Sequence, residues 1–84
     1  MFDTPVQYKP TVFLQVRNLA SKLDAQTVRE ALLALDGRAQ VRVDLLDRRI
    51  EVRSSWAEPH DLRDAISRVG FATARQWPSE LLLN

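Results

Sequence analysis

The hydrophobic residues of this chain follow two different spacings, and the order in which these spacings alternate restricts the fold more than any other feature. Apolar residues at every second position are typical of half-buried strands, and apolar residues three and four positions apart are typical of amphipathic helices. In chain order, the spacings predict strand 11–17, helix 25–35, strand 41–45, strand 50–53, helix 59–69 and strand 71–77. A strand–helix–strand unit that occurs twice predicts an α+β fold of the ferredoxin-like βαββαβ type, in which two helices cover one face of a four-stranded antiparallel sheet.

The alternation within the strands also assigns each residue to one face of the sheet. The residues predicted to face the helices are Val12, Leu14, Val16, Val41, Val43, Ile50 and Val52. Their neighbours on the open face are Phe13, Gln15, Arg17, Arg42, Asp44, Glu51 and Arg53. A sheet that binds RNA stacks bases on two or three aromatic side chains, whereas this face has only Phe13 among charges of both signs. We therefore expect no nucleic-acid binding.

Particular residues mark the expected ends of the helices. Asp24 is predicted to be the N-cap of the first helix, and Asp36-Gly37 is predicted to end it because glycine adopts the left-handed conformation without steric cost. Pro59 suits the first turn of the second helix, and Gly70 follows its last apolar residue. The residues 46–49 are expected to form the turn between the two middle strands.

Composition excludes several classes of function. The chain has 84 residues, enough for one domain, with no cysteine, one histidine and a formal net charge of +1. Disulfides, thiolate metal sites and cysteine nucleophiles are therefore excluded, and the near balance of charge argues against binding to nucleic acid or anionic membranes. His60 has no apparent catalytic partner except its neighbour Asp61, and there is no glycine-rich phosphate loop, so we expect no enzyme activity and no cofactor. The N-terminus does not resemble a signal peptide and no apolar run reaches the ~20 residues of a membrane span, so we expect a cytoplasmic protein without membrane insertion.

The two ends of the chain differ in character from its middle. Residues 1–10 contain two prolines and no hydrophobic period, and are expected to be a flexible lead-in to a domain over 11–77. Residues 78–84 are expected to be a C-terminal tail. Three adjacent leucines in this tail, Leu81, Leu82 and Leu83, would form an apolar patch if left in water, so we expect them to dock on the domain, a second copy or another protein. Trp77 precedes the tail and is a further candidate contact, because tryptophan is enriched at protein interfaces.

The sequence resembles the heavy-metal-associated (HMA) domain family over most of its length. Residues 16–24, Val-Arg-Asn-Leu-Ala-Ser-Lys-Leu-Asp, are similar to the family's opening V-x-G-M-x-C-x-x-C. Residues 41–45 are similar to its V-x-V-D-L strand, and the segment from Asp61 to Ala72 is similar to its closing L-x-x-A-I-x-x-x-G-F/Y-x-A. The resemblance implies the βαββαβ fold, and it implies a role in metal homeostasis, because family members carry Cu(I), Zn(II), Cd(II) or Hg(II) on the two cysteines. Such members are small metallochaperones, mercury carriers or N-terminal domains of metal-pumping ATPases.

The resemblance fails at the two metal ligands. Ser21 and Asp24 stand at the cysteine positions, and Asn18 and Leu19 stand at the preceding glycine and methionine positions. Soft metal ions select thiolate ligands, so we expect no soft-metal binding and predict that no residue of this chain is a metal ligand. We expect instead a non-catalytic domain that works by protein–protein contact or self-association, with Asn18, Leu19, Ser21, Lys22 and Asp24 in the contact surface. One alternative is metal transport through Asp24 with other non-thiolate ligands, and another is small-molecule sensing on a ferredoxin-like sheet.

Overall fold

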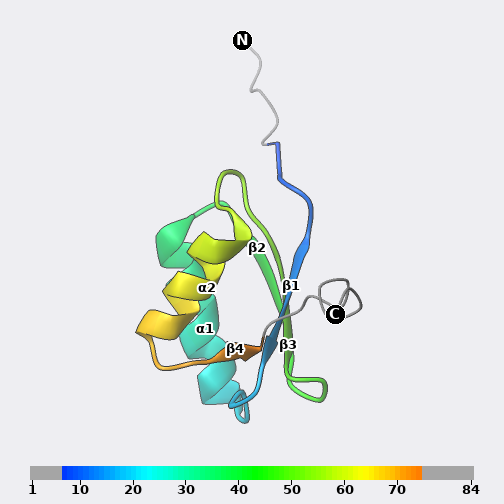
Figure 1. The fold of residues 1–84 in the computed structure, drawn as a ribbon, viewed down its shortest axis with the longest axis vertical. Coiled ribbons are helices and arrows are strands. Elements are labelled where there is room, and N and C mark those ends of the chain that lie inside the picture. Colours follow the sequence, from blue (N-terminus) through cyan, green and yellow to red (C-terminus); the bar gives the residue numbers. More distant parts are fainter. Residues whose placement is uncertain (1–6, 75–84) are drawn as a thin grey trace, which may run out of the picture.

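The elements follow the predicted order. In a computed structural model of the chain, which describes residues 7–74, they are β1 (Val12–Val16), α1 (Lys22–Leu35), β2 (Gln40–Asp44), β3 (Arg49–Arg53), α2 (Pro59–Arg68) and β4 (Thr73–Ala74) (Figure 1). The four strands form one sheet in the order β2-β3-β1-β4, with antiparallel pairing throughout. The ferredoxin-like fold is thus confirmed.

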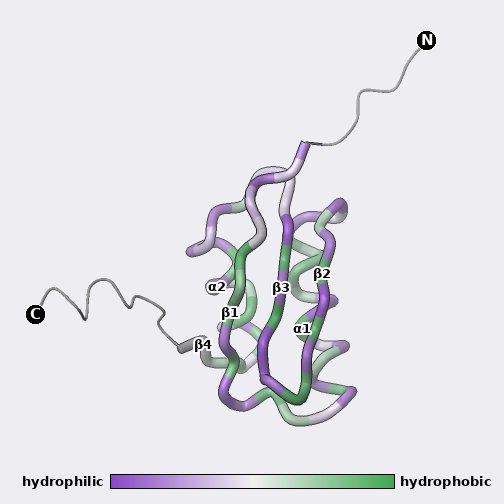
Figure 2. Tube along the Cα trace, turned by 90° about the vertical axis from the view of Figure 1, so that its right-hand side faces the viewer, coloured by the Kyte–Doolittle hydropathy of each residue, from purple (hydrophilic) through white to green (hydrophobic). Residues whose placement is uncertain are grey.

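Both helices lie on the same face of the sheet, and the core lies between the two layers (Figure 1). Figure 2 shows β1, β3 and β2 side by side with the helices behind them. The buried apolar side chains of this core come from every layer and are Leu14, Val16, Leu19, Val28, Leu32, Ile50, Val52, Ala57, Leu62, Ala65, Ile66 and Phe71. Val12, Val41 and Val43 are partly buried and pack against this core, so the predicted helix-facing set is confirmed.

The open face of the sheet carries the expected mixture of charges. Phe13 is opposite Glu51 in the β1–β3 register, and Arg42 is opposite Glu51 in the β2–β3 register. Phe13 remains 46% exposed, with the guanidinium carbon of Arg49 5.5 Å from its ring centroid. Among residues 7–74, the strands therefore place one exposed aromatic ring on this face, and a cation lies over it.

The first helix ends at Leu35 as predicted, but its start and the conformation after its end differ from the prediction. α1 begins at Lys22, three residues earlier than expected, because Ser21 and not Asp24 is the N-cap. Its C-cap is Asp36 in an extended conformation, with φ −142°. Gly70 has a φ of 95° and is the only described glycine with a positive φ, so the prediction of a left-handed Gly37 is wrong. The prediction that Gly70 follows the end of the second helix is confirmed.

The carboxylate of Asp36 explains how α1 ends. This side chain is buried, and its Oδ2 accepts hydrogen bonds from the Ser54 hydroxyl at 2.7 Å, the Ser55 backbone N–H at 2.8 Å and the Ser55 hydroxyl at 3.0 Å. Its Oδ1 accepts the Arg38 backbone N–H at 2.9 Å. Burial alone would raise the pKa of Asp36, but the bonds from Ser54, Ser55 and Arg38 lower the pKa to about 2. Asp36 thus joins the end of α1 to the connection between β3 and α2.

The hairpin between β2 and β3 is shifted by one residue from the prediction. Its turn comprises residues 45–48, since β2 ends at Asp44 and β3 begins at Arg49. The Asp44 carboxylate accepts the Asp47 backbone N–H at 3.1 Å, and Arg48 has a positive φ of 52°. Leu46 at the tip is 96% exposed.

Residues near the two ends of the described range also contact the domain. Tyr8, in the segment expected to be a flexible lead-in, donates its hydroxyl to the Arg38 carbonyl at 3.0 Å, and the backbone N–H of Lys9 bonds to the Ser54 carbonyl at 2.8 Å. Only Thr73–Ala74 of the predicted last strand is assigned as β4, and residues 75–77 lie outside the described range, as do Leu81, Leu82 and Leu83. Within residues 7–74, no helix has the length and hydrophobicity needed to cross a membrane.

Candidate functional site

The loop between β1 and α1 contains the residues that resemble the metal-binding loop of the family. It lies at the lower end of the domain in Figure 1, where α2 also ends and β4 begins. The Arg17 N–H bonds to the Ala72 carbonyl at 3.3 Å, which continues the β1–β4 pairing into the loop. The fold thus brings the start of this loop, at Arg17 and Asn18, beside residues 70–72.

The two side chains at the cysteine positions form a capping box. The Ser21 hydroxyl accepts the Asp24 backbone N–H at 3.1 Å. The Asp24 carboxylate in turn accepts the backbone N–H groups of Ala20 at 2.9 Å and Ser21 at 3.1 Å. Such reciprocal bonds satisfy N–H groups that the first turn of a helix leaves without a partner. As predicted, the Asp24 carboxylate accepts backbone N–H groups at the start of the helix. Asp24 is, however, the third residue of α1, and the N-cap of α1 is Ser21.

Asn18 joins the loop to the segment that follows α2. Its amide nitrogen donates to the Gly70 carbonyl at 3.1 Å, and its amide oxygen accepts the Ala72 backbone N–H at 3.2 Å. Sequence reasoning placed Asn18 in a contact surface and missed this role, because the partners are more than 50 positions away in the chain.

We expect Asn18→Ala to lower the free energy of unfolding by about 1–2 kcal/mol, because it removes two hydrogen bonds to backbone groups. Urea unfolding of the variant would measure this loss. Asn18→Asp can still accept from Ala72 but places a second acceptor against the Gly70 carbonyl, so it should also be less stable than the natural chain. Equal stability of all three proteins would contradict the assigned contacts.

Leu19 and Phe71 are core residues. Leu19 is 0% exposed and Phe71 is 9% exposed. Leu19 packs in the core, so its predicted place in a contact surface is corrected, since a fully buried side chain does not reach a partner. Lys22 is exposed, and its neighbour Leu23, which sequence reasoning did not single out, is 70% exposed.

The tip of the β2–β3 hairpin is attached to the same end of the domain. The Gln15 side-chain amide donates to the carbonyls of Asp47 at 2.6 Å and Arg48 at 3.1 Å, and the Arg48 guanidinium reaches the Arg17 carbonyl at 3.4 Å. The exposed Leu46 at this tip therefore belongs to the same end of the domain as Leu23.

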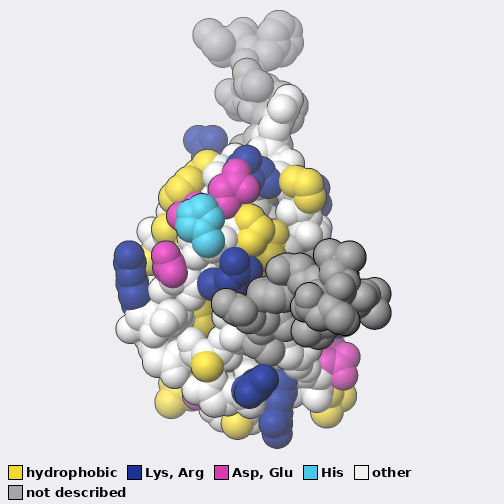
Figure 3. Space-filling model, viewed as in Figure 1, with side chains coloured by type: hydrophobic (Ala, Val, Ile, Leu, Met, Phe, Trp, Pro, Cys, Tyr) yellow, Lys and Arg dark blue, Asp and Glu magenta, His cyan; other side chains and the backbone are white. Residues whose placement is uncertain are grey.

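Other chemistry-bearing residues lie apart from this loop. His60 is at the start of α2, at the opposite end of the helix from the loop, and its Nε2 is 3.2 Å from Asp61 Oδ1 with the histidine side chain 68% exposed. Lysine, arginine and acidic side chains are scattered over the side of the domain shown in Figure 3. Among residues 7–74, no group of three or more His, Cys, Asp or Glu side chains is placed to hold a metal ion.

The fold and this loop define a small βαββαβ domain in which a helix cap stands at the metal-loop position. No family model matches the sequence, and no curated protein matches it. Solved structures do: the copper chaperone Atx1 from Synechocystis PCC6803, in a trimeric form, has 30% identity and a TM-score of 0.71 over 75% of this chain and 98% of its own. A gold-binding protein has 25% identity and a TM-score of 0.70 over 76% of this chain and 97% of its own. The chain belongs to the heavy-metal-associated domain family and lacks the two cysteines of its metal-binding motif.

Proposed function

We propose that this chain is a non-catalytic, cytoplasmic member of the family that acts in metal homeostasis by binding another protein at the surface around the start of α1. Similarity to metallochaperones supports the metal-homeostasis context. The observation that carries the proposal is a loop that has hydrogen-bonded helix caps in place of cysteines and lies beside an exposed Lys22 and a Leu23 that is 70% exposed.

The hydrogen bonds of the loop argue against a soft metal ion as its cargo. The Ser21 oxygen and one oxygen of Asp24 already accept three backbone N–H groups, and a metal ion bound there would compete with them. A neutral hydroxyl and a carboxylate are also hard oxygen donors, whereas Cu(I) selects soft sulfur ligands.

The same hydrogen bonds favour recognition by a protein. Because the box fixes the first turn of α1, Lys22 and Leu23 are presented from a rigid backbone, which reduces the entropy lost on binding. An exposed leucine beside a cation suits a partner surface with an apolar pocket and an acidic rim. We propose an HMA-fold domain as that partner, and Trp77, Leu81, Leu82 and Leu83 as further contacts.

An NMR titration tests the proposed surface. Isotope-labelled protein is titrated with candidate HMA domains, and we expect the largest shift changes at residues 20–24. Leu23→Ser should weaken binding about tenfold, since it removes one exposed apolar anchor. Leu33→Ser is the matched control, because Leu33 is also exposed and lies ten residues, or about 15 Å, further along α1. Equal effects of both substitutions, or shifts only outside the loop, would refute the surface.

A metal titration separates this proposal from metal transport through non-thiolate ligands. Cu(I) and Zn(II) are added in competition with a chromophoric chelator. We expect no one-to-one complex tighter than micromolar. A complex of that strength which is lost in Asp24→Asn would establish the alternative.

A further inference from the structure

Strand β2 forms one edge of the sheet, and its outward backbone groups can be assigned. The Val16 N–H donates to the Arg48 carbonyl at 2.8 Å, and the Lys9 N–H donates to the Ser54 carbonyl at 2.8 Å. The backbone N–H and carbonyl groups of even-numbered residues along β3 therefore point towards β1. The backbone groups of odd-numbered residues of β3 consequently point towards β2, where they form hydrogen-bonded pairs with Gln40, Arg42 and Asp44. The backbone groups of Val41 and Val43 therefore point away from the sheet.

A bond from α1 supports this assignment. The Arg29 guanidinium donates to the Val41 carbonyl at 2.9 Å, so this carbonyl faces the open side of β2. No described residue is bonded to the N–H or the carbonyl of Val43 on that side. An unpaired edge of this kind is a template for a further strand.

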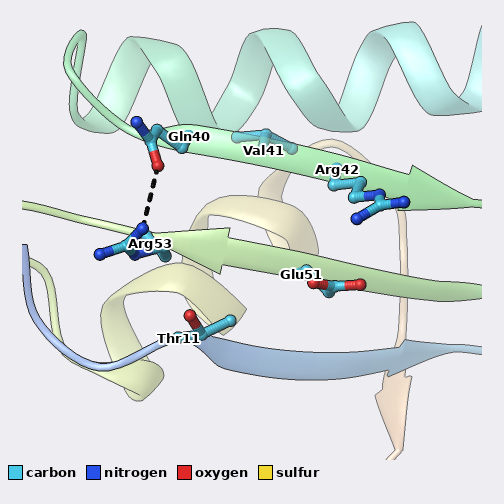
Figure 4. Close-up of a pocket in the computed structure, with 6 residues that line it drawn as sticks. All are labelled: Thr11, Gln40, Val41, Arg42, Glu51 and Arg53. Atoms are coloured by element: carbon cyan, nitrogen blue, oxygen red, sulfur yellow. Dashed lines mark hydrogen bonds between the residues drawn. The ribbon is translucent and has the colours of Figure 1, made fainter.

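Charges on the open face select one register for pairing with a second copy. In an antiparallel pair centred on Val43, Arg42 of each copy lies opposite Asp44 of the other. Within each chain Arg42 lies opposite Glu51, and Asp44 lies opposite Arg49, so opposite signs alternate continuously across the junction. A register centred on Arg42 would instead place two arginines opposite each other, and it would pair Val43 with Val41, whose carbonyl already accepts from Arg29. Figure 4 shows Arg42 and Glu51 on β2 and β3 at this side of the sheet.

Apolar side chains on the helix side fit the same register. Val41, Val43 and Leu45 are only partly buried in the single chain, although they pack against the core. Centred on Val43, the pairing places the two Val43 side chains opposite each other and Val41 opposite Leu45 of the second copy. Their remaining exposed surface would be covered by like residues.

We propose that β2 is a self-association site at which two copies of this chain join edge to edge, with Val43 on the two-fold axis. The two sheets form one continuous eight-stranded sheet. This surface is independent of the proposed contact at the start of α1.

Charge reversal tests the proposal in solution. Sedimentation of the full chain over a concentration series should show a monomer–dimer equilibrium. Arg42→Glu places a carboxylate opposite Asp44 twice in each dimer, so we expect association to weaken by about tenfold or more. Arg53→Glu is the matched control, because it makes the same change on the same face but on the inner strand β3. Arg29→Ala releases the Val41 carbonyl for pairing and should strengthen association.

Cysteine cross-linking tests the register, since the natural chain contains no cysteine. Arg42→Cys and Asp44→Cys proteins should form a disulfide when mixed in a thiol–disulfide buffer, because directly opposite Cα atoms in a non-hydrogen-bonded pair are about 4.5 Å apart. Neither protein alone should cross-link to the same extent. A strictly monomeric wild type at millimolar concentration would overturn the proposal. If the Val43 amide hydrogen exchanged slowly in such a monomer, the edge of β2 would instead be covered by another segment of the same chain. Cross-linking of Arg42→Cys alone would overturn the register.

Discussion

Replacing Asp36 by alanine is expected to lower the free energy of unfolding by about 3 kcal/mol, which for a domain of this size is a large part of the total. The substitution leaves the buried Ser54 hydroxyl and the backbone N–H groups of Ser55 and Arg38 without their acceptor. A loss of this size corresponds to a fall of about 15 °C in Tm for a domain of 60–100 residues. Urea unfolding and calorimetry at neutral pH measure both quantities. Asp64→Ala is the control, since Asp64 is an exposed acidic residue of α2, and it should change stability by less than about 0.5 kcal/mol.

The acid dependence of stability gives a second readout for Asp36. Its pKa in the folded protein is lowered from 3.8 to about 2, so the folded state holds the proton less tightly than the unfolded chain does. The stabilisation is therefore present above about pH 4 and is lost as the pH falls towards 2. At about 1.4 kcal/mol per pKa unit, Asp36 contributes about 2 kcal/mol to this pH dependence. Asp36→Ala should lack this contribution. The same loss of stability between pH 5 and pH 2 in both proteins would show that other carboxylates cause it.

Periodic features of the sequence predicted most of the fold. Apolar residues at alternate positions in 11–17 and 41–45 indicate strands with one buried face. Leu32 and Leu62 lie on helical stripes that are buried as expected. These patterns are local, so one sequence is enough to recognise them. The start of α1 was predicted less accurately, because Ser21 and Asp24 are both common helix caps and only the backbone conformation at Ser21 decides between them.

Contacts between distant segments could not be predicted in the same way. Asp36 beside a glycine is typical of an exposed turn, but Ser54 and Ser55 approach it from 18 and 19 positions away and allow it to be buried. Asn18 is similar, since its bonds reach Gly70 and Ala72. Polar side chains of this kind carry no period, and their partners are defined only when the sheet and helices are assembled.

The candidate site contains both features that the local sequence predicted and contacts that it did not predict. The loss of the two cysteines is evident from the sequence, and the sequence also predicted capping by Asp24. The structure adds that the side chain of each of Ser21 and Asp24 accepts the backbone N–H of the other. The positions that correspond to the family's metal ligands therefore stabilise the start of α1. It also shows Leu23 to be the exposed apolar residue of this surface, whereas Leu19 is buried.

Restoring the two cysteines is expected to convert the loop into a Cu(I) site. In the double variant S21C/D24C, two thiols would occupy the positions at which family members hold their metal, and the core residues Leu19 and Phe71 would still support the loop. Because Cu(I) selects thiolate over oxygen donors, we expect a one-to-one complex tighter than micromolar in competition with a chromophoric chelator, against none of that strength for the natural chain. Since the capping box is lost, the metal-free variant should be less stable by about 1–2 kcal/mol.

The double variant S21A/D24A separates these two effects. It should lose the same stability as S21C/D24C and gain no affinity for Cu(I), so any metal-dependent recovery of Tm in the cysteine variant is attributable to the thiols. Because the chain has no other cysteine, a thiol assay should count two reactive groups before metal is added and a smaller number after. If S21C/D24C is folded, carries two free thiols and still fails to bind Cu(I), then the backbone of residues 17–24 no longer has the geometry of a metal loop. The Asn18 bridge to Gly70 and Ala72 would then be the first contact to remove, by adding Asn18→Gly to the variant.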